Sequence, residues 1–196
     1  MKWIIAGLGN PEPEYRGTRH NAGRFALDEI LRQYAFPDWE YKKTYNALVS
    51  KGEIAATQVL LIAPETYMND SGKSLHTLIK EPSQAAQLIV LYDDIDLPLG
   101  TWRISFDRGS GGHNGIKSLT TVLKTKAFIR IRIGICQKDQ EGKTIKPKGK
   151  DAVLAHVLGK FTPDEKKLQS KVAQEISMAL PTILTLGKEK AMETYN

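Results

Sequence analysis

Polar side chains that could activate a water molecule occur in four separate segments of the sequence. They are, in chain order, Asn10, His20, Asn69, Asp93 and Asn114. A histidine whose pKa lies near neutrality can take a proton from water. An aspartate on its other ring nitrogen fixes the tautomer and stabilises the imidazolium. Asparagine amides can donate hydrogen bonds to an oxygen that gains negative charge. Together these residue types indicate hydrolysis.

The sequence places no serine or cysteine as a nucleophile, so direct attack by water is the simplest chemistry. Tyr15 and Tyr67 would form apolar walls of such a pocket. Each polar residue also has a structural interpretation. Asn10 before Pro11 is a common turn pair, an asparagine can cap a helix, and a lone histidine beside a helix start is more often structural. Their occurrence together, in loops that follow strands or open a helix, favours a site.

Other familiar motifs are incomplete. The run IIAGLGNP resembles a dinucleotide-binding turn, but Glu12 stands where the third glycine is needed. The run SGKS resembles the end of a phosphate-binding loop, but Tyr67 stands where its first glycine is needed. The run DDID could offer oxygen ligands to a metal, yet no second carboxylate-rich segment accompanies it. The sequence therefore predicts neither a metal nor an organic cofactor.

Composition narrows the class of protein further. The chain has 196 residues and a formal charge of +6, which suits one domain over residues 1–196 and mildly favours an anionic partner. Cys136 is the only cysteine, so an internal disulfide is excluded. No run is long and apolar enough to span a membrane. We expect a reduced, cytoplasmic protein.

Hydrophobic patterning predicts alternating strands and helices. Strands are expected at residues 3–6, 46–52, 57–63, 88–92, 101–106 and 128–135, and helices at 21–34, 71–80 and 114–124. In the last strand Ile129, Ile131 and Ile133 share one face, with Arg130 and Arg132 on the other. A capping box at 162–165 opens a terminal helix, with an interruption near Pro181. The pattern indicates an α/β fold: a twisted, mixed but largely parallel sheet flanked by helices, with a C-terminal helix.

One lysine-rich stretch, residues 138–151, carries no strand or helix pattern. Its lysines and turn residues predict a mobile surface loop. It could also contact phosphates, although a run of charges is usually solvated.

Six segments in order resemble the signatures of bacterial-type peptidyl-tRNA hydrolase. They are GLGNPEPEYRGTRHNAG, PETYMNDSGKS, YDDIDLPLG, GSGGHNGIKS, RIRIGI and VLGKF, and they extend to about Phe161. The resemblance implies cleavage of the ester between a peptide and the ribose of tRNA. It implies recycling of tRNA from peptidyl-tRNAs released early or trapped on stalled ribosomes. It also implies a monomeric, cytoplasmic protein without a cofactor.

The resemblance also implies roles for individual residues. His20 would accept the proton, Asp93 would support it, and Asn10 would distinguish blocked from free aminoacyl ends. Substrate-contact positions would be Tyr15, Tyr67, Met68, Asn69 and Asn114.

The sequence departs from the family in two places. Many members carry a lysine or arginine where Ser105 stands, which grips a tRNA phosphate. Nearby candidates for this contact are Arg103, Arg108, Lys117 and Arg132, of which we predict Arg132. The second departure is the stretch from residue 136 to 150, which is longer and more basic than usual in the family.

Two other functions remain compatible with this fold. A non-catalytic RNA-binding protein could use the same scaffold, because fold does not imply function. Retention of the whole polar set, from Asn10 to Asn114, argues against it. A nicotinamide-dependent enzyme is the weaker rival, because its glycine motif is incomplete.

Overall fold

A mixed β-sheet forms the centre of the computed structural model, which describes residues 2–11 and 13–196. Glu12, the residue that breaks the dinucleotide motif, lies outside the described residues. The strand order is β2-β3-β4-β1-β5-β7-β6. The four central strands β4, β1, β5 and β7 run parallel, and the outer pairings are antiparallel. The strands are β1 (Trp3–Gly7), β2 (Glu40–Lys42), β3 (Ala47–Ile54), β4 (Thr57–Pro64), β5 (Leu88–Pro98), β6 (Trp102–Phe106) and β7 (Ile129–Cys136).

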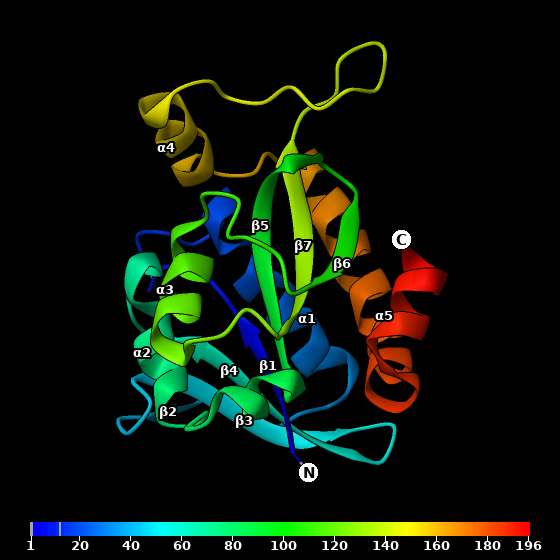
Figure 1. Ribbon diagram of the computed structural model, residues 1–196. Helices are drawn as coiled ribbons and strands as arrows, with labels where there is room; N and C mark the ends of the chain where they lie inside the picture. The colour runs from blue at the N-terminus through cyan, green and yellow to red at the C-terminus, as the bar shows by residue number, and fades with distance from the viewer. Residues whose placement is uncertain (1, 12) are drawn as a thin grey trace.

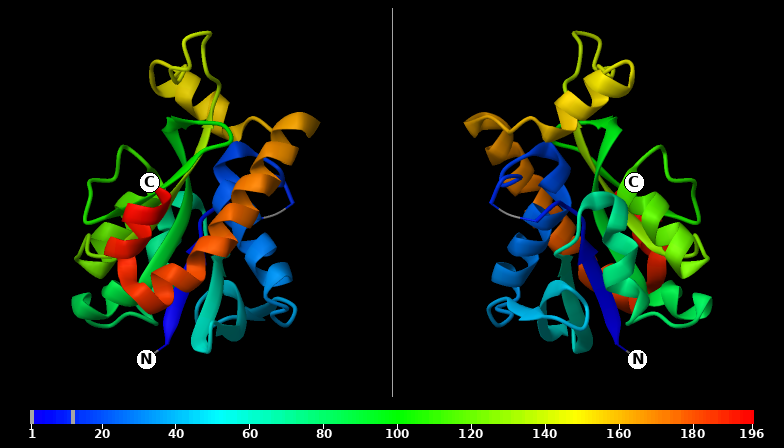
Figure 2. Two further views of the ribbon diagram at one scale, coloured as in Figure 1. Left: turned by 90° about the vertical axis from the view of Figure 1, so that its right-hand side faces the viewer. Right: turned by 90° about the vertical axis from the view of Figure 1, so that its left-hand side faces the viewer.

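Helices cover both faces of the sheet (Figure 1). Helices α1 (Ala22–Gln33) and α5 (Pro163–Tyr195) pack on one face, in a core that includes Leu27, Ile131 and Ile176. Helices α2 (Ser71–His76) and α3 (Asn114–Leu123) pack on the other. Helix α4 (Lys150–Leu158) and the preceding loop project at the end of the molecule opposite the N-terminus (Figures 1 and 2). The predicted α/β fold is therefore confirmed.

Strand β7 shows the predicted division between its two faces. Ile129 and Ile131 lie in the core beneath α1 and α5. Arg130 is fully buried on the other face, where its Nη1 donates to the carbonyl of Gly109 at 2.7 Å. Successive side chains of a strand point to opposite faces, so the apolar residues all reach one core.

Helix α1 approaches the sheet very closely at Gly23. A Cβ atom at this position would lie 2.2 Å from the carbonyl oxygen of Leu91 and 2.8 Å from the backbone nitrogen of Leu8. Only glycine permits this separation. The close contact brings the residues just before α1 over the ends of β1 and β5.

Several features differ from the sequence-based expectation. Strand β5 does not end at Tyr92 but continues through the DDID run to Pro98, and α2 ends at His76 rather than near residue 80. The short strand β2 and helix α4 carry no clear pattern and were not predicted, and Lys150 and Asp151 belong to α4 rather than to a loop. The terminal helix is interrupted at Gly187, where φ is 87°, and not near Pro181. Glycine reaches this left-handed conformation without the clash of a Cβ atom, so the chain turns there.

No helix in the described part of the chain is long and apolar enough to cross a membrane.

Candidate active site

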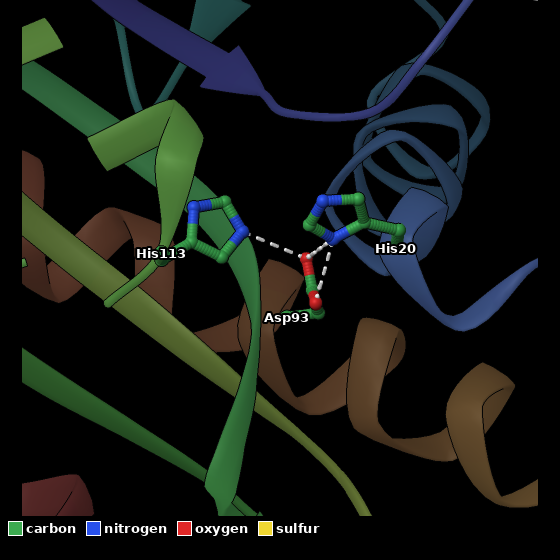
Figure 3. Close-up of side chains that lie close together, drawn as sticks. All are labelled: His20, Asp93 and His113. Atoms are coloured by element: carbon green, nitrogen blue, oxygen red, sulfur yellow. Dashed lines mark hydrogen bonds and ion pairs between the residues drawn. The ribbon is translucent and has the colours of Figure 1, made fainter. Parts of the chain in front are cut away.

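His20 and Asp93 form the centre of the site. His20 lies in a single turn of 3-10 helix, η1 (Arg19–Asn21), that leads into α1, and Asp93 lies in β5. Nδ1 of His20 is 2.9 Å from each oxygen of the Asp93 carboxylate (Figure 3). The exposed fractions of the two side chains are 12% and 2%. The structure thus brings together the two residues predicted to act as base and support.

A second histidine contacts the same carboxylate. Nε2 of His113 lies 2.9 Å from Oδ1 of Asp93, an oxygen that Nδ1 of His20 also contacts (Figure 3). His113 precedes α3 and caps it, because its Nδ1 accepts a hydrogen bond from the backbone nitrogen of Ile116 at 3.3 Å. The sequence analysis overlooked His113 and selected its neighbour Asn114. The only available signal was its position beside Asn114 in the fourth polar segment.

These contacts determine where the protons lie. Because Nδ1 of His113 accepts from an N–H group, its Nε2 carries the hydrogen and donates to Asp93. Nδ1 of His20 also donates to Asp93, which leaves Nε2 of His20 free to accept a proton. A carboxylate with several acceptor positions can serve both rings.

One ring nitrogen of His20, one ring nitrogen of His113 and one carboxylate oxygen of Asp93 lie within 4.8 Å of one another, which is close enough for the three to bind a metal ion. A metal-bound histidine donates its second N–H group to an acceptor. Nδ1 of His113 instead faces the Ile116 N–H, which is a donor. The arrangement therefore suits a proton network better than a metal site.

Electrostatics at the pair favour an ionised aspartate and a basic histidine. Burial opposes the charged imidazolium of His20, but attraction to Asp93 and their hydrogen bond outweigh it, so the pKa of His20 is raised. Burial also opposes ionisation of Asp93, and here His20 and His113 outweigh it and hold the pKa of Asp93 far below its usual value. Asp93 is therefore a carboxylate at neutral pH.

Asn10 is held by two neighbouring segments, although it is not among the residues that line the cavity of His20 and Asp93. The side chain of Asn21 accepts from the backbone nitrogen of Asn10 at 2.9 Å and donates to its carbonyl at 3.1 Å. Oδ1 of Asn10 accepts from the backbone nitrogen of Met68 at 2.8 Å, which leaves the amide nitrogen as its donor. Asn21 occupies the expected cap position of α1, but its side chain makes no cap hydrogen bond.

The other predicted contact residues lie in the same loops. The rings of Tyr15 and Tyr67 meet edge to face with centroids 6.3 Å apart, and Tyr67 is 59% exposed. Met68 is buried, while Asn69 is exposed in η2 (Met68–Asp70). Asn114 begins α3 and is also exposed. Tyr15 and Tyr67 thus contact each other, but neither is among the residues that line the cavity of His20 and Asp93. No hydrogen bond links Asn69 or Asn114 to the His20–Asp93 pair in the described residues.

A cavity of about 400 Å³ opens beside the pair. His20, Asp93, His113 and Asn114 contribute to its lining. Its apolar wall comes from α4 and consists of Val153, Leu154 and Val157. This wall was not expected, because the sequence pattern shows no helix over residues 150–158.

Arg132 lies beside the site but is already engaged. Its Nε donates to Asp94 at 2.7 Å. It lines a second cavity of about 600 Å³ together with Arg103, Arg108 and the buried Ser105. Three of the four predicted candidates for phosphate contact therefore share one cavity, and Lys117 is not among its lining residues.

Fold and site together define an α/β protein with a buried histidine–aspartate pair beside the part of β5 that extends beyond the end of β1. The family model described as peptidyl-tRNA hydrolase matches residues 4–196. The chain is 40% identical to the peptidyl-tRNA hydrolase of Thermoanaerobacter sp. (strain X514), over 99% of each chain, and 37% identical to that of Aquifex aeolicus, over 98% and 95%. It superposes on the crystal structure of peptidyl-tRNA hydrolase from Acinetobacter baumannii with a TM-score of 0.87, at 29% identity over 99% and 94% of the two chains. The chain therefore belongs to the peptidyl-tRNA hydrolase family.

Proposed function

We propose that this protein hydrolyses the ester bond between the peptide and the tRNA of peptidyl-tRNA, and so recycles tRNA from molecules released early or trapped on stalled ribosomes. Membership of the family supports the enzyme class. The observation that supports this mechanism best is the donation from His20 Nδ1 to Asp93, which leaves a basic nitrogen beside the cavity. We also propose that the protein acts as a monomer in the cytoplasm and needs no cofactor.

In the proposed reaction a water molecule attacks the ester carbonyl carbon while Nε2 of His20 takes its proton. Asp93 stabilises the resulting imidazolium. The tetrahedral intermediate then collapses, the bond between carbon and ribose oxygen breaks, and His20 returns the proton to that oxygen. The products are the peptide carboxylate and tRNA with a free hydroxyl group. His113 donates a second hydrogen bond to Asp93 and exchanges no proton with the substrate.

Asn10 would recognise the blocked amine. Its amide nitrogen is the donor left after Oδ1 accepts from Met68. This donor suits the carbonyl oxygen of a peptide bond. A free ammonium group offers only donors, so it would leave the buried Asn10 amide unpaired, which is costly. Asn69 and Asn114 would contact the substrate and hold the water, and Tyr15, Tyr67 and Met68 would border the peptide and the terminal adenosine.

Replacement of His20 tests the mechanism directly. We expect His20→Ala to lower kcat on a defined N-blocked aminoacyl-tRNA by about two to four powers of ten, as for other general bases. Arg32→Ala, on the exposed face of α1, is a suitable control. Turnover of His20→Ala near the wild-type rate would rule out the general base. The unblocked aminoacyl-tRNA should be hydrolysed much more slowly by the wild type.

A non-catalytic RNA-binding function is not favoured, because the paired His20 and Asp93 have the geometry that general-base catalysis needs.

A further inference from the structure

The turn that carries His20 has little means of holding its own position. Helix η1 consists of only three residues, and Thr18, its N-cap, makes no side-chain cap hydrogen bond. A 3-10 turn this short has weak internal hydrogen bonding. The orientation of His20 toward Asp93 must therefore come from contacts with the rest of the fold.

The connection between α4 and α5 supplies these contacts. The backbone nitrogen of Arg19 donates to the carbonyl of Gly159 at 2.9 Å, and that of Phe161 donates to the carbonyl of Gly17 at 2.9 Å. Thr18 and Lys160 form an antiparallel bridge. Residues 17–19 thus pair with residues 159–161, more than 130 positions later in the chain.

The side chain of Arg19 extends this pairing to a carboxylate. Its Nη1 donates to the carbonyl of Lys160 at 3.0 Å, and its Nη2 lies 3.0 Å and 2.8 Å from the two oxygens of Glu165. The guanidinium also lies over the ring of Phe161, 5.4 Å from its centroid. Arg19 and Glu165 are only 14% and 9% exposed in their side chains, so solvent screens this pair weakly.

Glu165 joins three separate parts of the structure. Besides Arg19, its carboxylate accepts from Nε2 of Gln137 at 2.7 Å and from the backbone nitrogen of Thr162 at 2.8 Å. Gln137 directly follows β7, and Thr162 caps α5. Burial opposes ionisation of Glu165, but the hydrogen bonds from Thr162, Arg19 and Gln137 outweigh it and lower its pKa. The group is therefore an anion at neutral pH.

We propose that Glu165 is a positioning residue for His20: through Arg19 it holds the η1 turn so that the imidazole meets Asp93. The same contact fixes the chain directly after α4, whose apolar wall lines the cavity that His20 also lines. Glu165 thereby holds both the turn that carries the base and the chain next to α4. The proposal rests on the proposed function only in the role that it gives to His20.

Glu165→Gln is the most direct test, because it keeps the size of the side chain and removes its charge. We expect kcat on an N-blocked aminoacyl-tRNA to fall about tenfold or more, because a displacement on the order of 1 Å can cost that much. In an NMR titration of the His20 ring, the raised pKa should move back toward its ordinary value. Arg19→Lys keeps the cation but loses the forked geometry, and it should show the same two changes.

Glu175→Gln provides the control on the same helix. Glu175 also accepts a side-chain hydrogen bond, from Nε1 of Trp102 at 3.0 Å, but it is remote from His20. It should retain wild-type kcat and an unchanged His20 titration.

The outcomes separate positioning from simple stabilisation. If Glu165→Gln lowers only the melting temperature, and kcat and the His20 titration stay at wild-type values, the proposal is wrong. A rise confined to KM would also overturn it. Should Glu165→Gln fail to fold, Arg19→Lys decides by the same criteria. If the wild type itself hydrolyses no peptidyl-tRNA, the proposed function fails, while the titration of His20 still tests the positioning role.

Discussion

The carboxylate of Asp93 sets how strongly His20 binds a proton. It accepts hydrogen bonds from two rings and is almost entirely removed from solvent. In a buried site the interaction between opposite charges is strong, so small changes at Asp93 should have large effects on His20. Because His20 and His113 both donate to Asp93, a change at either Asp93 or His113 should alter the pKa of His20.

Removal of the Asp93 charge should move the pH profile. Hydrolysis needs neutral His20, so kcat/KM should rise with pH through the pKa of His20, which Asp93 raises above its ordinary value. Asp93→Asn removes the attraction that raises this pKa, so the midpoint of the rise should shift to lower pH. The limiting rate should also fall, by about two to four powers of ten, because the tautomer is no longer fixed. A profile with an unchanged midpoint would contradict the pairing. The measurement is kcat/KM between pH 5 and pH 9, on the order of one point every half unit.

Loss of the second histidine should have the opposite effect on the midpoint. His113→Leu removes a hydrogen-bond donor from Asp93, so the carboxylate interacts more strongly with His20 and raises its pKa further. The midpoint should therefore shift to higher pH. His113→Gln keeps a donor of similar reach and should change the profile much less. A shift to lower pH in His113→Leu would show that His113 mainly holds Asp93 in place rather than competing for its charge.

Among the elements, the contact of α1 with the sheet fixes the helix to which the η1 turn is attached. The helix approaches the backbone of β1 and β5 at Gly23, where a Cβ atom has no space. This contact also explains why the residues before α1 reach both Asn10 and Asp93. The packing of α1 against the sheet at Gly23 therefore affects the geometry of the site.

A methyl group at Gly23 should disturb this packing. We expect Gly23→Ala to lower the free energy of unfolding by about 1–3 kcal/mol, as overpacking of a core usually does. Gly109→Ala is the control, because nothing lies within 4 Å of its added methyl group. It should change stability by less than about 0.5 kcal/mol. Chemical denaturation measures the free energy of unfolding of both variants. Equal stability of the two variants would show that α1 can move away from the sheet without cost.

At the scale of the whole molecule, the two cores share one sheet. The core under α1 and α5 and the core under α2 and α3 lie on opposite faces of the same strands. We infer from this that residues 1–196 form one domain. The basic side chains Arg103, Arg108 and Arg132 line one cavity beside the His20–Asp93 pair, and we propose that they contact the phosphates of tRNA.

Binding of tRNA should weaken as salt increases, because phosphate contacts release counterions. Arg132→Ala should lower the affinity and reduce the slope of log K against log salt by about one, if Arg132 makes one phosphate contact. The Arg132→Ala variant should hydrolyse a small N-blocked aminoacyl ester, which lacks the tRNA body, at the same rate as the wild type. Arg32→Ala on α1 is the matched control. An affinity that does not respond to salt would exclude a basic tRNA-binding face.

The sequence alone was enough to predict the α/β class of fold and the pairing of His20 with Asp93. Apolar runs that alternate with helical patterns predicted the sheet, and the polar residues after these runs predicted where the site would form. His20 and Asp93 stand 73 positions apart. They meet because β1 ends at Gly7, opposite Leu91, and β5 continues past it, so the segment that follows β1 can reach Asp93. The paired faces of β7 were predictable because strand periodicity is local.

The contacts that hold the predicted site residues in place became visible only in the tertiary structure. His113 reaches Asp93, Asn21 holds Asn10, and Glu165 holds Arg19 across 146 positions. Helix α4 and its apolar wall also could not be predicted from the sequence pattern. Each of these contacts depends on the direction of a side chain after packing, and on segments that the sequence does not place side by side. A local pattern records which face of an element is apolar, but not which partner from elsewhere in the chain will meet it.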